Sequence, residues 1–228
     1  MPKSIAGPED GKVRMDRNNR ETVLFFTMAL VGGLLAGFSV VRSGLLSSAE
    51  TMNLITIVSS LLSRDLHQLA LRLGVALFFA LSIAAATLLK NDRRIQLWAI
   101  LVDILGVLIV GLIPGRHNSV AVLYPLFFAC GLQWCAFPGA RGYTSSCVFS
   151  TNNFRQLMAG LTGGLSGQDP DGFRRARFFG TTLLLFHIGV ASALWLGRVM
   201  DGRSIWFTLV PLGCALRLCL LKLRGSAE

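Results

Sequence analysis

Two short polar triplets stand in apolar surroundings 100 residues apart, Thr51-x-Asn53 and Thr151-x-Asn153. A hydroxyl or carboxamide at membrane depth must find a hydrogen-bond partner, and it can bond backbone groups that are freed where a helix breaks. In transporters built from inverted repeats, broken helices meet near the midplane and form the solute or ion site. We therefore expect both triplets, with Glu50 beside the first, to converge on a solute or ion pathway. The alternative is that they cap short helices and fasten the packing.

Asp103 interrupts the apolar stretch AILVDILGVLIVGL, where a charged residue costs about 2.5–3.5 kcal/mol on membrane insertion. Such residues face the interior of a helix bundle, where they pair with another charge or hold a proton. Arg217 stands at a similar depth in its own stretch, roughly 10 Å from the end at the rise of an α-helix. We predict an Asp103–Arg217 ion pair. Two alternatives remain open: Arg217 extends to the interface with Lys222 and Arg224, or a protonatable Asp103 couples transport to an ion.

No other pattern indicates catalysis or metal binding. The sequence contains no GxSxG, HExxH or P-loop motif, so we expect neither an enzyme nor a cofactor. The five cysteines are odd in number and form no CxxC pair, which favours reduced thiols that pack as small residues. The three histidines are far apart in sequence, and no metal site is expected. His187 is predicted to hydrogen-bond a neighbouring helix; the alternative is a proton relay.

The composition identifies the setting of these residues. Of the 228 residues, 53% are hydrophobic and 15% are charged, and the mean hydropathy is +0.59. A soluble domain usually carries about a quarter charged residues, so these values exclude a disordered or fibrous protein and disfavour a cytosolic enzyme. The formal net charge of +10 comes from 22 basic and 12 acidic residues. In so apolar a chain, this excess is typical of the cytoplasmic loops of a membrane protein.

Six stretches are long and apolar enough to cross a bilayer core about 30 Å thick, which needs roughly 20 helical residues. They are residues 22–41, 69–89, 96–113, 119–137, 178–197 and 204–223. Two further stretches, 45–62 and 143–165, are moderately apolar but carry Ser, Thr and Asn. Each could be a span, an interfacial helix or a re-entrant segment. Six spans place most of the basic residues on one side, which predicts a membrane protein with both termini in the cytoplasm.

The sequence also contains an internal repeat. Gly33-Leu34 aligns with Gly131-Leu132, and each copy continues through a Thr-x-Asn triplet, an apolar stretch, a short basic loop and a last apolar stretch. Because each copy holds three spans, the second must enter the membrane from the opposite side. We predict an all-α membrane protein of six transmembrane helices in two inverted three-helix repeats, each with a re-entrant or interfacial helical segment. The expected divisions are a cytoplasmic tail (1–21), the first repeat (22–113), a linker (114–118), the second repeat (119–223) and a C-terminal tail (224–228).

These motifs resemble the YoaK-like family of bacterial integral membrane proteins, whose function is uncharacterised. Its members typically show G-x-x-D-A in a glycine-rich first span, then T-G-N, and later G-x-Q-N followed by T-G-N or T-G-T. The resemblance covers residues 22–223 and adds Gln133 to the candidate pathway. Ala36, Met52 and Trp134 depart from the pattern, which indicates a divergent member. The corresponding positions here are Gly33-Leu34-Leu35-Ala36-Gly37, Thr51-Met52-Asn53, Gly131-Leu132-Gln133-Trp134 and Thr151-Asn152-Asn153.

Small residues predict where helices approach closely. Gly33 and Gly37 share one stretch, and Gly160 and Gly164 share another. Such spacing permits close packing within the chain or between copies in a homo-oligomer. A different local feature, the stretch QDPDGFRRAR at 168–177, is expected to be a solvated loop that closes onto lipid headgroups.

The functional hypothesis follows from the spans, the repeat and the few polar groups inside them. We expect a small-solute or ion transporter in the lipid bilayer, by analogy with other inverted-repeat proteins. The alternative is a non-transporting membrane scaffold or accessory protein, in which the shared residues serve packing alone. Nucleic acid is not an expected partner.

Pro125 and Pro211 fall inside the fourth and sixth stretches and are expected to kink them.

Overall fold

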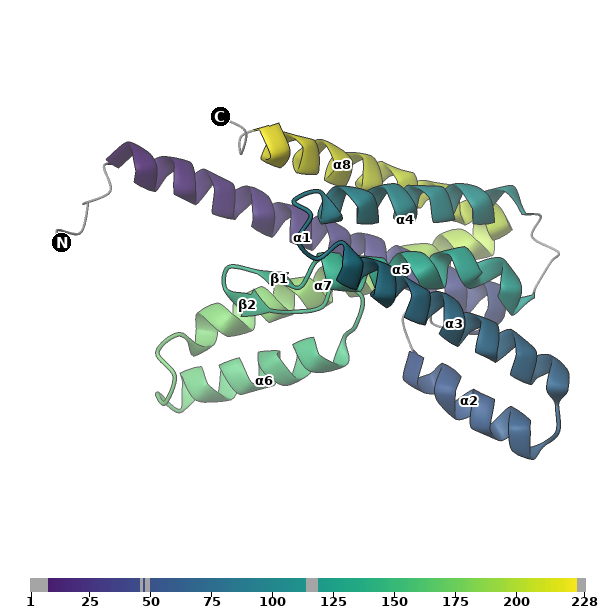
Figure 1. Ribbon diagram of the computed structural model, residues 1–228. Coiled ribbons are helices and arrows are strands. Elements are labelled where there is room, and N and C mark those ends of the chain that lie inside the picture. The colour runs from purple at the N-terminus through teal and green to yellow at the C-terminus, as the bar shows by residue number, and fades with distance from the viewer. Residues whose placement is uncertain (1–7, 46, 48–49, 114–118, 225–228) are drawn as a thin grey trace.

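The computed structural model describes residues 8–45, 47, 50–113 and 119–224, with side chains from residue 18 onward except that of residue 201. The expected linker (114–118), the end of the expected C-terminal tail (225–228) and residues 1–7 lie outside the described residues. Figure 1 shows the helices gathered into a bundle from which two helical hairpins diverge. This helical fold agrees with the sequence, because in an apolar environment a helix satisfies its backbone hydrogen bonds internally.

Within the described residues, five helices are long and apolar enough to cross a membrane. They occupy five of the six expected stretches, so the all-α class is as predicted, whereas a count of six is not confirmed. These helices are Asn18–Ser43 within α1 (Pro8–Ser43), α3 (Leu66–Leu88), α4 (Ile95–Leu112), α7 (Gly172–Met200), and Gly202–Arg224, which joins most of the 3₁₀ helix η2 (Asp201–Thr208) to α8 (Leu209–Arg224).

The remaining expected span forms a shorter apolar helix, Val120–Ala136. It consists of the 3₁₀ helix η1 (Val120–Leu123) followed by α5 (Tyr124–Ala136). The helix ends at Phe137, whose φ of −122° and ψ of 70° lie outside the helical region. Phe137 precedes Pro138, and a residue before proline is pushed out of the α-helical region by a clash with the ring.

The two prolines expected to kink spans do not do so. Pro125 lies in the first turn of α5, directly after η1, and Pro211 lies in the first turn of α8, directly after η2. The first turn tolerates proline because its missing N–H would have had no partner inside the helix. The expected kinks are therefore wrong, and each proline instead marks the change from a 3₁₀ helix to an α-helix.

The two ambiguous stretches contain short helices. The first holds α2 (Glu50–Leu62); the second holds strand β2 (Tyr143–Thr144), a loop, and α6 (Thr151–Leu165). β2 pairs antiparallel with β1 (Gly139–Ala140). The turn between the strands has positive φ at Arg141 (55°) and Gly142 (79°), as a two-residue hairpin turn requires. In Figure 1, α2 and α6 begin near the middle of the long dimension of the molecule and run in opposite directions.

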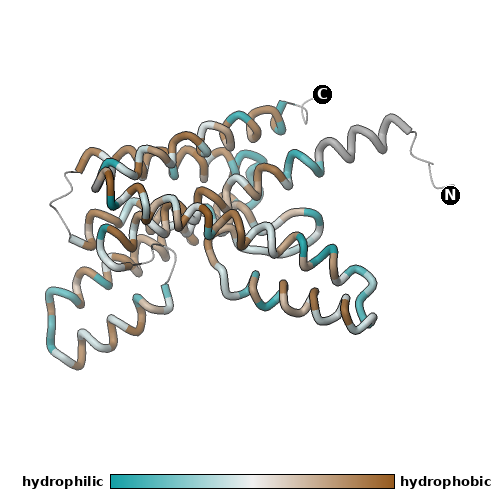
Figure 2. Tube along the Cα trace, turned by 180° about the vertical axis from the view of Figure 1, so that it is seen from behind, coloured by the Kyte–Doolittle hydropathy of each residue, from teal (hydrophilic) through white to brown (hydrophobic). Residues whose placement is uncertain are grey.

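Helices from the first half of the chain pack against helices from the second half. α1 packs on α7 and α8, whereas α5 packs on α3 and α4. α2 lies against α3, α6 lies against α7, and α4 also contacts α8. Hydrophilic residues gather at the outer ends of the α2–α3 and α6–α7 hairpins, as Figure 2 shows, whereas the helices of the bundle are largely apolar.

Glycines bring α1 into close contact with α7. A Cβ atom at Gly33 would overlap the carbonyl oxygen of Phe186, and one at Gly189 would overlap that of Leu30. A Cβ atom at Gly37 would lie 2.8 Å from the carbonyl oxygen of Val190, closer than real Cβ atoms approach. Helix backbones can come this close only where a side chain is missing.

Glycines also join α6 to α7. A Cβ atom at Gly160 would lie 2.8 Å from the carbonyl oxygen of Gly172, and one at Gly164 would lie 3.0 Å from the ring of Phe173. All four glycines expected to serve packing, on α1 and on α6, therefore face a neighbouring helix of the same chain.

Candidate functional site

Asp103 is completely buried on α4, and neither carboxylate oxygen has a hydrogen-bond partner among the described residues. The predicted ion pair with Arg217 is not formed, because Arg217 is exposed on α8. It lines a shallow surface groove together with Leu220 and Arg224. The prediction placed both residues at a similar depth, but it did not fix the direction in which α8 turns its side chains.

The packing of α8 explains the position of Arg217. The buried residues of α8 are Leu212, Ala215 and Cys219. Arg217 lies two residues from both Ala215 and Cys219, which at 3.6 residues per turn places it on the opposite face of the helix. The remaining alternatives for Asp103 are a neutral, protonated carboxyl group or a carboxylate that meets a cation.

A buried polar cluster surrounds Asp103. The Nε2 atom of Gln133, on α5, donates to the carbonyl oxygen of Met28 at 2.8 Å and to Cys147 Sγ at 3.4 Å. Ser47 Oγ lies 3.4 Å from Cys130 Sγ. Asp103 is close enough to act electrostatically on the thiols of Cys130 and Cys147. Gln133 Oε1 is a second buried atom without a hydrogen-bond partner in the described part of the chain.

The cluster brings together the loops that precede the two short helices. Ser47 stands four residues before Thr51 and Cys147 stands four residues before Thr151, so they occupy the same position in the two copies of the repeat. Both are fully buried. The cluster also includes α4 through Asp103 and α5 through Cys130 and Gln133. We define these five residues, Ser47, Asp103, Cys130, Gln133 and Cys147, as the central cluster.

Asn153 holds the loop before α6 in place. Its Oδ1 accepts hydrogen bonds from Ser145 Oγ at 2.8 Å and from the backbone N–H of Ser146 at 3.3 Å. Its Nδ2 donates to the carbonyl oxygens of Ser146 at 2.6 Å and Phe149 at 3.0 Å. Each polar atom of the carboxamide is thus used twice, while Thr151 is exposed. This arrangement corresponds to the fastening role that was the alternative for the triplet.

Asn53 is bonded less completely. Its Nδ2 donates to Glu50 Oε1 and to the carbonyl oxygen of Arg72, both at 3.1 Å, which ties α2 to α3. Its Oδ1, together with Glu50 Oε2 and two guanidinium nitrogens of Arg72, has no hydrogen-bond partner among the described residues. Thr51 is exposed, as is Thr151. The carboxamide of Asn53 therefore has an oxygen without a hydrogen bond among the described residues, whereas that of Asn153 does not.

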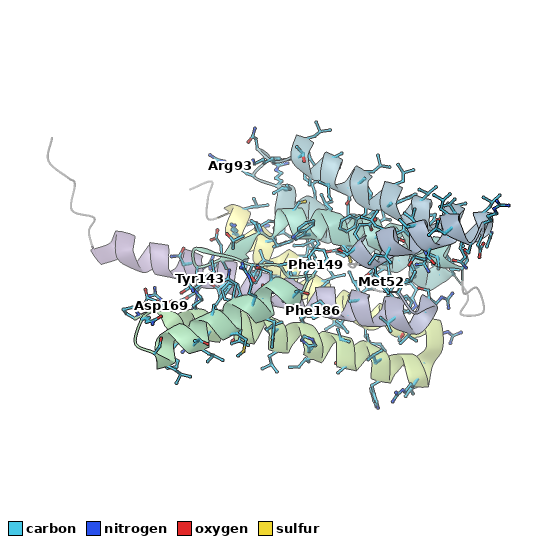
Figure 3. All side chains as sticks on the ribbon, turned by 90° about the horizontal axis from the view of Figure 1, so that it is seen from below. Met52, Arg93, Tyr143, Phe149, Asp169 and Phe186 are labelled. Carbon is cyan, nitrogen blue, oxygen red and sulfur yellow. The ribbon has the colours of Figure 1, made fainter. Side chains whose placement is uncertain are left out.

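The structure corrects the expected convergence of the two triplets. Asn53 faces α3 and Asn153 faces its own loop, so the four Thr and Asn side chains do not meet. Ser47 and Cys147, each four residues before its triplet, are both buried in the central cluster instead. In Figure 3, Met52 and Phe149 both lie near the middle of the molecule, whereas Tyr143 and Asp169 lie together at one end. Sequence reasoning identified Asp103 and Gln133 but missed Ser47, Cys130 and Cys147, although the repeat register places Ser47 opposite Cys147.

His187 makes its hydrogen bond within its own helix. Its Nδ1 atom lies 2.8 Å from the carbonyl oxygen of Leu183, one turn earlier on α7. The predicted hydrogen bond to a neighbouring helix is thus replaced by one within the same helix. Among the described residues, no three His, Cys, Asp or Glu side chains are grouped so that they could hold a metal ion.

The apolar helices and the buried polar cluster between them define a multi-helix membrane protein. The family model described as "Protein of unknown function (DUF1275)" matches residues 24–218, and the chain belongs to this family. The YoaK-like resemblance is consistent with this membership. No curated protein and no solved structure matches the chain.

Proposed function

We propose that the protein is a small-solute transporter built from two inverted repeats, with the central cluster as its solute and coupling site. In this proposal η1 and α5 form the sixth crossing, and α2 and α6 are re-entrant helices. Both termini lie in the cytoplasm of a bacterial inner membrane in this proposal, which the concentration of basic residues in the expected cytoplasmic segments supports. The observation that carries the proposal is the buried carboxyl group of Asp103, which has no hydrogen-bond partner in the described part of the chain.

The packing pattern supports the inverted repeat. If α1 to α4 correspond to α5 to α8, the contact of α1 with α7 corresponds to that of α5 with α3, and α1 with α8 corresponds to α5 with α4. The contacts of α2 with α3 and of α6 with α7 form a third matched set, and α4 with α8 corresponds to itself. A two-fold axis in the membrane plane produces this exchange, as in other transporters with inverted repeats.

The chemistry of Asp103 supports a coupling role. A buried charge that has no partner is strongly unfavourable, so this carboxyl group must hold a proton or meet a cation. Intramembrane carboxyl groups of this kind commonly belong to proton or ion relays in transporters. The matched loops of Ser47 and Cys147 adjoin it, so a change in its charge acts directly on both halves of the molecule.

The two short helices supply a complementary feature. The N-termini of α2 and α6 begin near the middle of the molecule (Figure 1), and Ser150, which precedes α6, makes no side-chain capping hydrogen bond. Uncapped N–H groups at a helix N-terminus carry partial positive charge and favour acceptor groups of a ligand. The proposed solute therefore carries a carboxylate or another hydrogen-bond acceptor, and the proton on Asp103 compensates its charge.

The scaffold alternative has one observation in its favour, the fully satisfied hydrogen bonds of Asn153. In a scaffold the central cluster stays dry at all times. In a transporter it must open to water in at least one state. Asp103, Cys130 and Cys147 are completely buried, so the described conformation is closed at the cluster.

The two cysteines of the central cluster provide a test that requires no known substrate. Protein in liposomes is treated from either side with a small charged thiosulfonate, and each cysteine is read separately by peptide mass mapping. We expect slow modification of Cys130 and Cys147. Cys219, which is equally buried on α8 away from the cluster, should stay unmodified and serves as the control.

Asp103→Asn tests the coupling role in the same assay. The labelling rate of Cys147 is measured in wild type and in Asp103→Asn over a range of pH. We expect the ratio of the two rates to change with pH, because only the carboxyl group of the wild type can gain or lose a proton. Asp92→Asn, in the loop between α3 and α4, should behave as wild type. If Cys130 and Cys147 remain as unreactive as Cys219 at every pH, the central cluster is closed to water and serves packing alone, and transport is excluded.

An uptake screen of small carboxylates in proteoliposomes, with Asp103→Asn as the inactive reference, identifies the solute.

A further inference from the structure

A polar cavity that no residue of the central cluster lines is found at the end of the molecule where α7 begins. It has a volume of about 880 Å³. Residues 18–26 of α1, the turn of the β1–β2 hairpin and the first turns of α7 surround it. Figure 3 shows Tyr143 and Asp169 together at this end of the molecule, while Arg93 lies on the other side. Elements distant in sequence thus build one cavity that the proposed transport site does not use.

Three exposed arginines line the cavity. Arg141, in the hairpin turn, donates from Nε to Thr22 Oγ1 at 3.1 Å, which fixes the turn against α1. Arg174 donates from Nε to the hydroxyl oxygen of Tyr143 at 3.4 Å and pairs with Asp171 at 3.0 Å. The guanidinium group of Arg177 makes no hydrogen bond or ion pair with the described residues. The cavity therefore presents positioned guanidinium groups, one of them uncommitted.

The single lining carboxylate does not cancel this charge. Glu21 forms an ion pair with Lys222 of α8, with 2.8 Å between Oε1 and Nζ. The lysine neutralises Glu21, so the three arginines give the cavity a net positive charge. Guanidinium groups bind phosphate through paired N–H donors, so a phosphate group is the anion that this arrangement fits best.

Aromatic side chains also line the cavity. The ring of Phe178 packs against that of Tyr143, with 5.1 Å between centroids, and against that of Phe26 at 5.5 Å. Phe173, at the rim, is 54% exposed. Phe26 and Phe178 belong to the apolar, membrane-crossing parts of α1 and α7. Basic and aromatic side chains that line one cavity at the end of two spanning helices match an amphiphile with a charged head.

We infer that this cavity binds the headgroup of an anionic phospholipid, with Arg174 and Arg177 on the phosphodiester and the acyl chains along the apolar surface of α1 and α7. Basic pockets between transmembrane helices on the cytoplasmic side are typical sites for such headgroups. The site is separate from the central cluster, and the inference does not depend on transport.

Native mass spectrometry of the full chain tests this inference. The purified protein is exchanged into mixtures of phosphatidylglycerol and phosphatidylcholine, and retained lipid is counted in each. We expect one retained phosphatidylglycerol in wild type. Apparent affinity should fall about fivefold in Arg177→Gln and about 25-fold in Arg174→Gln/Arg177→Gln, since one arginine near the membrane surface contributes roughly 1 kcal/mol. Arg93→Gln/Arg94→Gln removes two exposed arginines outside the cavity and should retain the lipid as wild type does.

Arg177→Gln is the decisive variant, because it removes no side-chain hydrogen bond or ion pair among the described residues and should unfold at the same temperature as wild type. Equal retention of phosphatidylglycerol by wild type and Arg177→Gln would overturn the assignment. Competition arms with sodium phosphate and with glycerol 3-phosphate separate the sources of phosphate. Full displacement of the lipid by either soluble anion would show a site for free phosphate instead, and would also overturn it.

Discussion

The α2–α3 and α6–α7 hairpins carry the same triplet on their first helices but are fastened differently. In the α6–α7 hairpin, Asn153 uses all its hydrogen-bonding atoms on the loop before α6, and Gly160 brings the backbones of the two helices together. In the α2–α3 hairpin, Asn53 Oδ1 has no hydrogen-bond partner among the described residues, and Ser60 stands where α6 has Gly160. We infer from this difference that the α6–α7 hairpin is the more rigid of the two, whereas the α2–α3 hairpin retains polar groups that a ligand or a conformational change can use.

The largest effect that would test this comparison comes from replacing the two asparagines. Asn153→Ala leaves four hydrogen-bonding groups in the 145–149 loop without their partner, and it should lower the free energy of unfolding by about 3 kcal/mol. Asn53→Ala removes two bonds, one of them to a partly exposed glutamate, and should lower it by about 1 kcal/mol. Unfolding by titration with SDS in mixed micelles measures both. Equal losses would show that the two hairpins are fastened alike.

The aligned glycines of α1 and α5 give the next effect. Gly33→Ala places a methyl group against the backbone carbonyl of Phe186, which cannot move aside, and should destabilise by about 2 kcal/mol. Gly131→Ala meets the hydroxyl of Ser82, which can rotate away or be removed. We expect a smaller loss for Gly131→Ala, and its recovery in a Gly131→Ala/Ser82→Ala variant. Gly213→Ala, which meets no atom within 4 Å, is the matched control. Failure of the double variant to recover stability would count against the difference between the halves.

The smallest effect comes from exchanging the residues at the matched position of α2 and α6. Gly160→Ser gives α6 the residue of α2 and should destabilise by about 1 kcal/mol, because its Cβ atom meets the Gly172 carbonyl. Ser60→Gly gives α2 the residue of α6 and should lose only about 0.5 kcal/mol, from the weaker helix propensity of glycine. Thermal unfolding in detergent compares the pair. A larger loss in Ser60→Gly than in Gly160→Ser would reverse the assignment of the rigid hairpin.

The sequence predicted the long helices well because an uninterrupted apolar run of about 20 residues has few structures other than a spanning helix. It predicted the polar residues of the interior less well. Asp103 was expected inside the bundle and lies there, but the partner proposed for it was wrong because Arg217 faces away from α4. Which face of α8 is buried depends on where α1 and α4 contact it, and a single apolar stretch does not contain that information.

The strands, the ends of α5 and the central cluster were also recognised only in the structure. Two-residue strands such as β1 and β2 carry no periodic signal, and only the Arg141–Gly142 turn indicates them locally. Pro138 could have predicted the early end of α5. Ser47 and Cys147 were accessible through the repeat register, but serine and cysteine are so common in packed interiors that their type alone does not indicate a site.

The crossed packing of the helices has a consequence for how the protein is made. α5 meets α3 and α4, which are synthesised just before it, so it can assemble as soon as it leaves the ribosome. α1 packs on α7 and α8, and Gly33 cannot make its contact with Phe186 until about 150 further residues have been synthesised. At a translation rate of about 5–20 residues per second this delay is on the order of 10–30 s. During this time α1 is held in the bilayer with its glycine face unmatched, which makes it the segment most in need of a chaperone or of temporary contact with the insertion machinery.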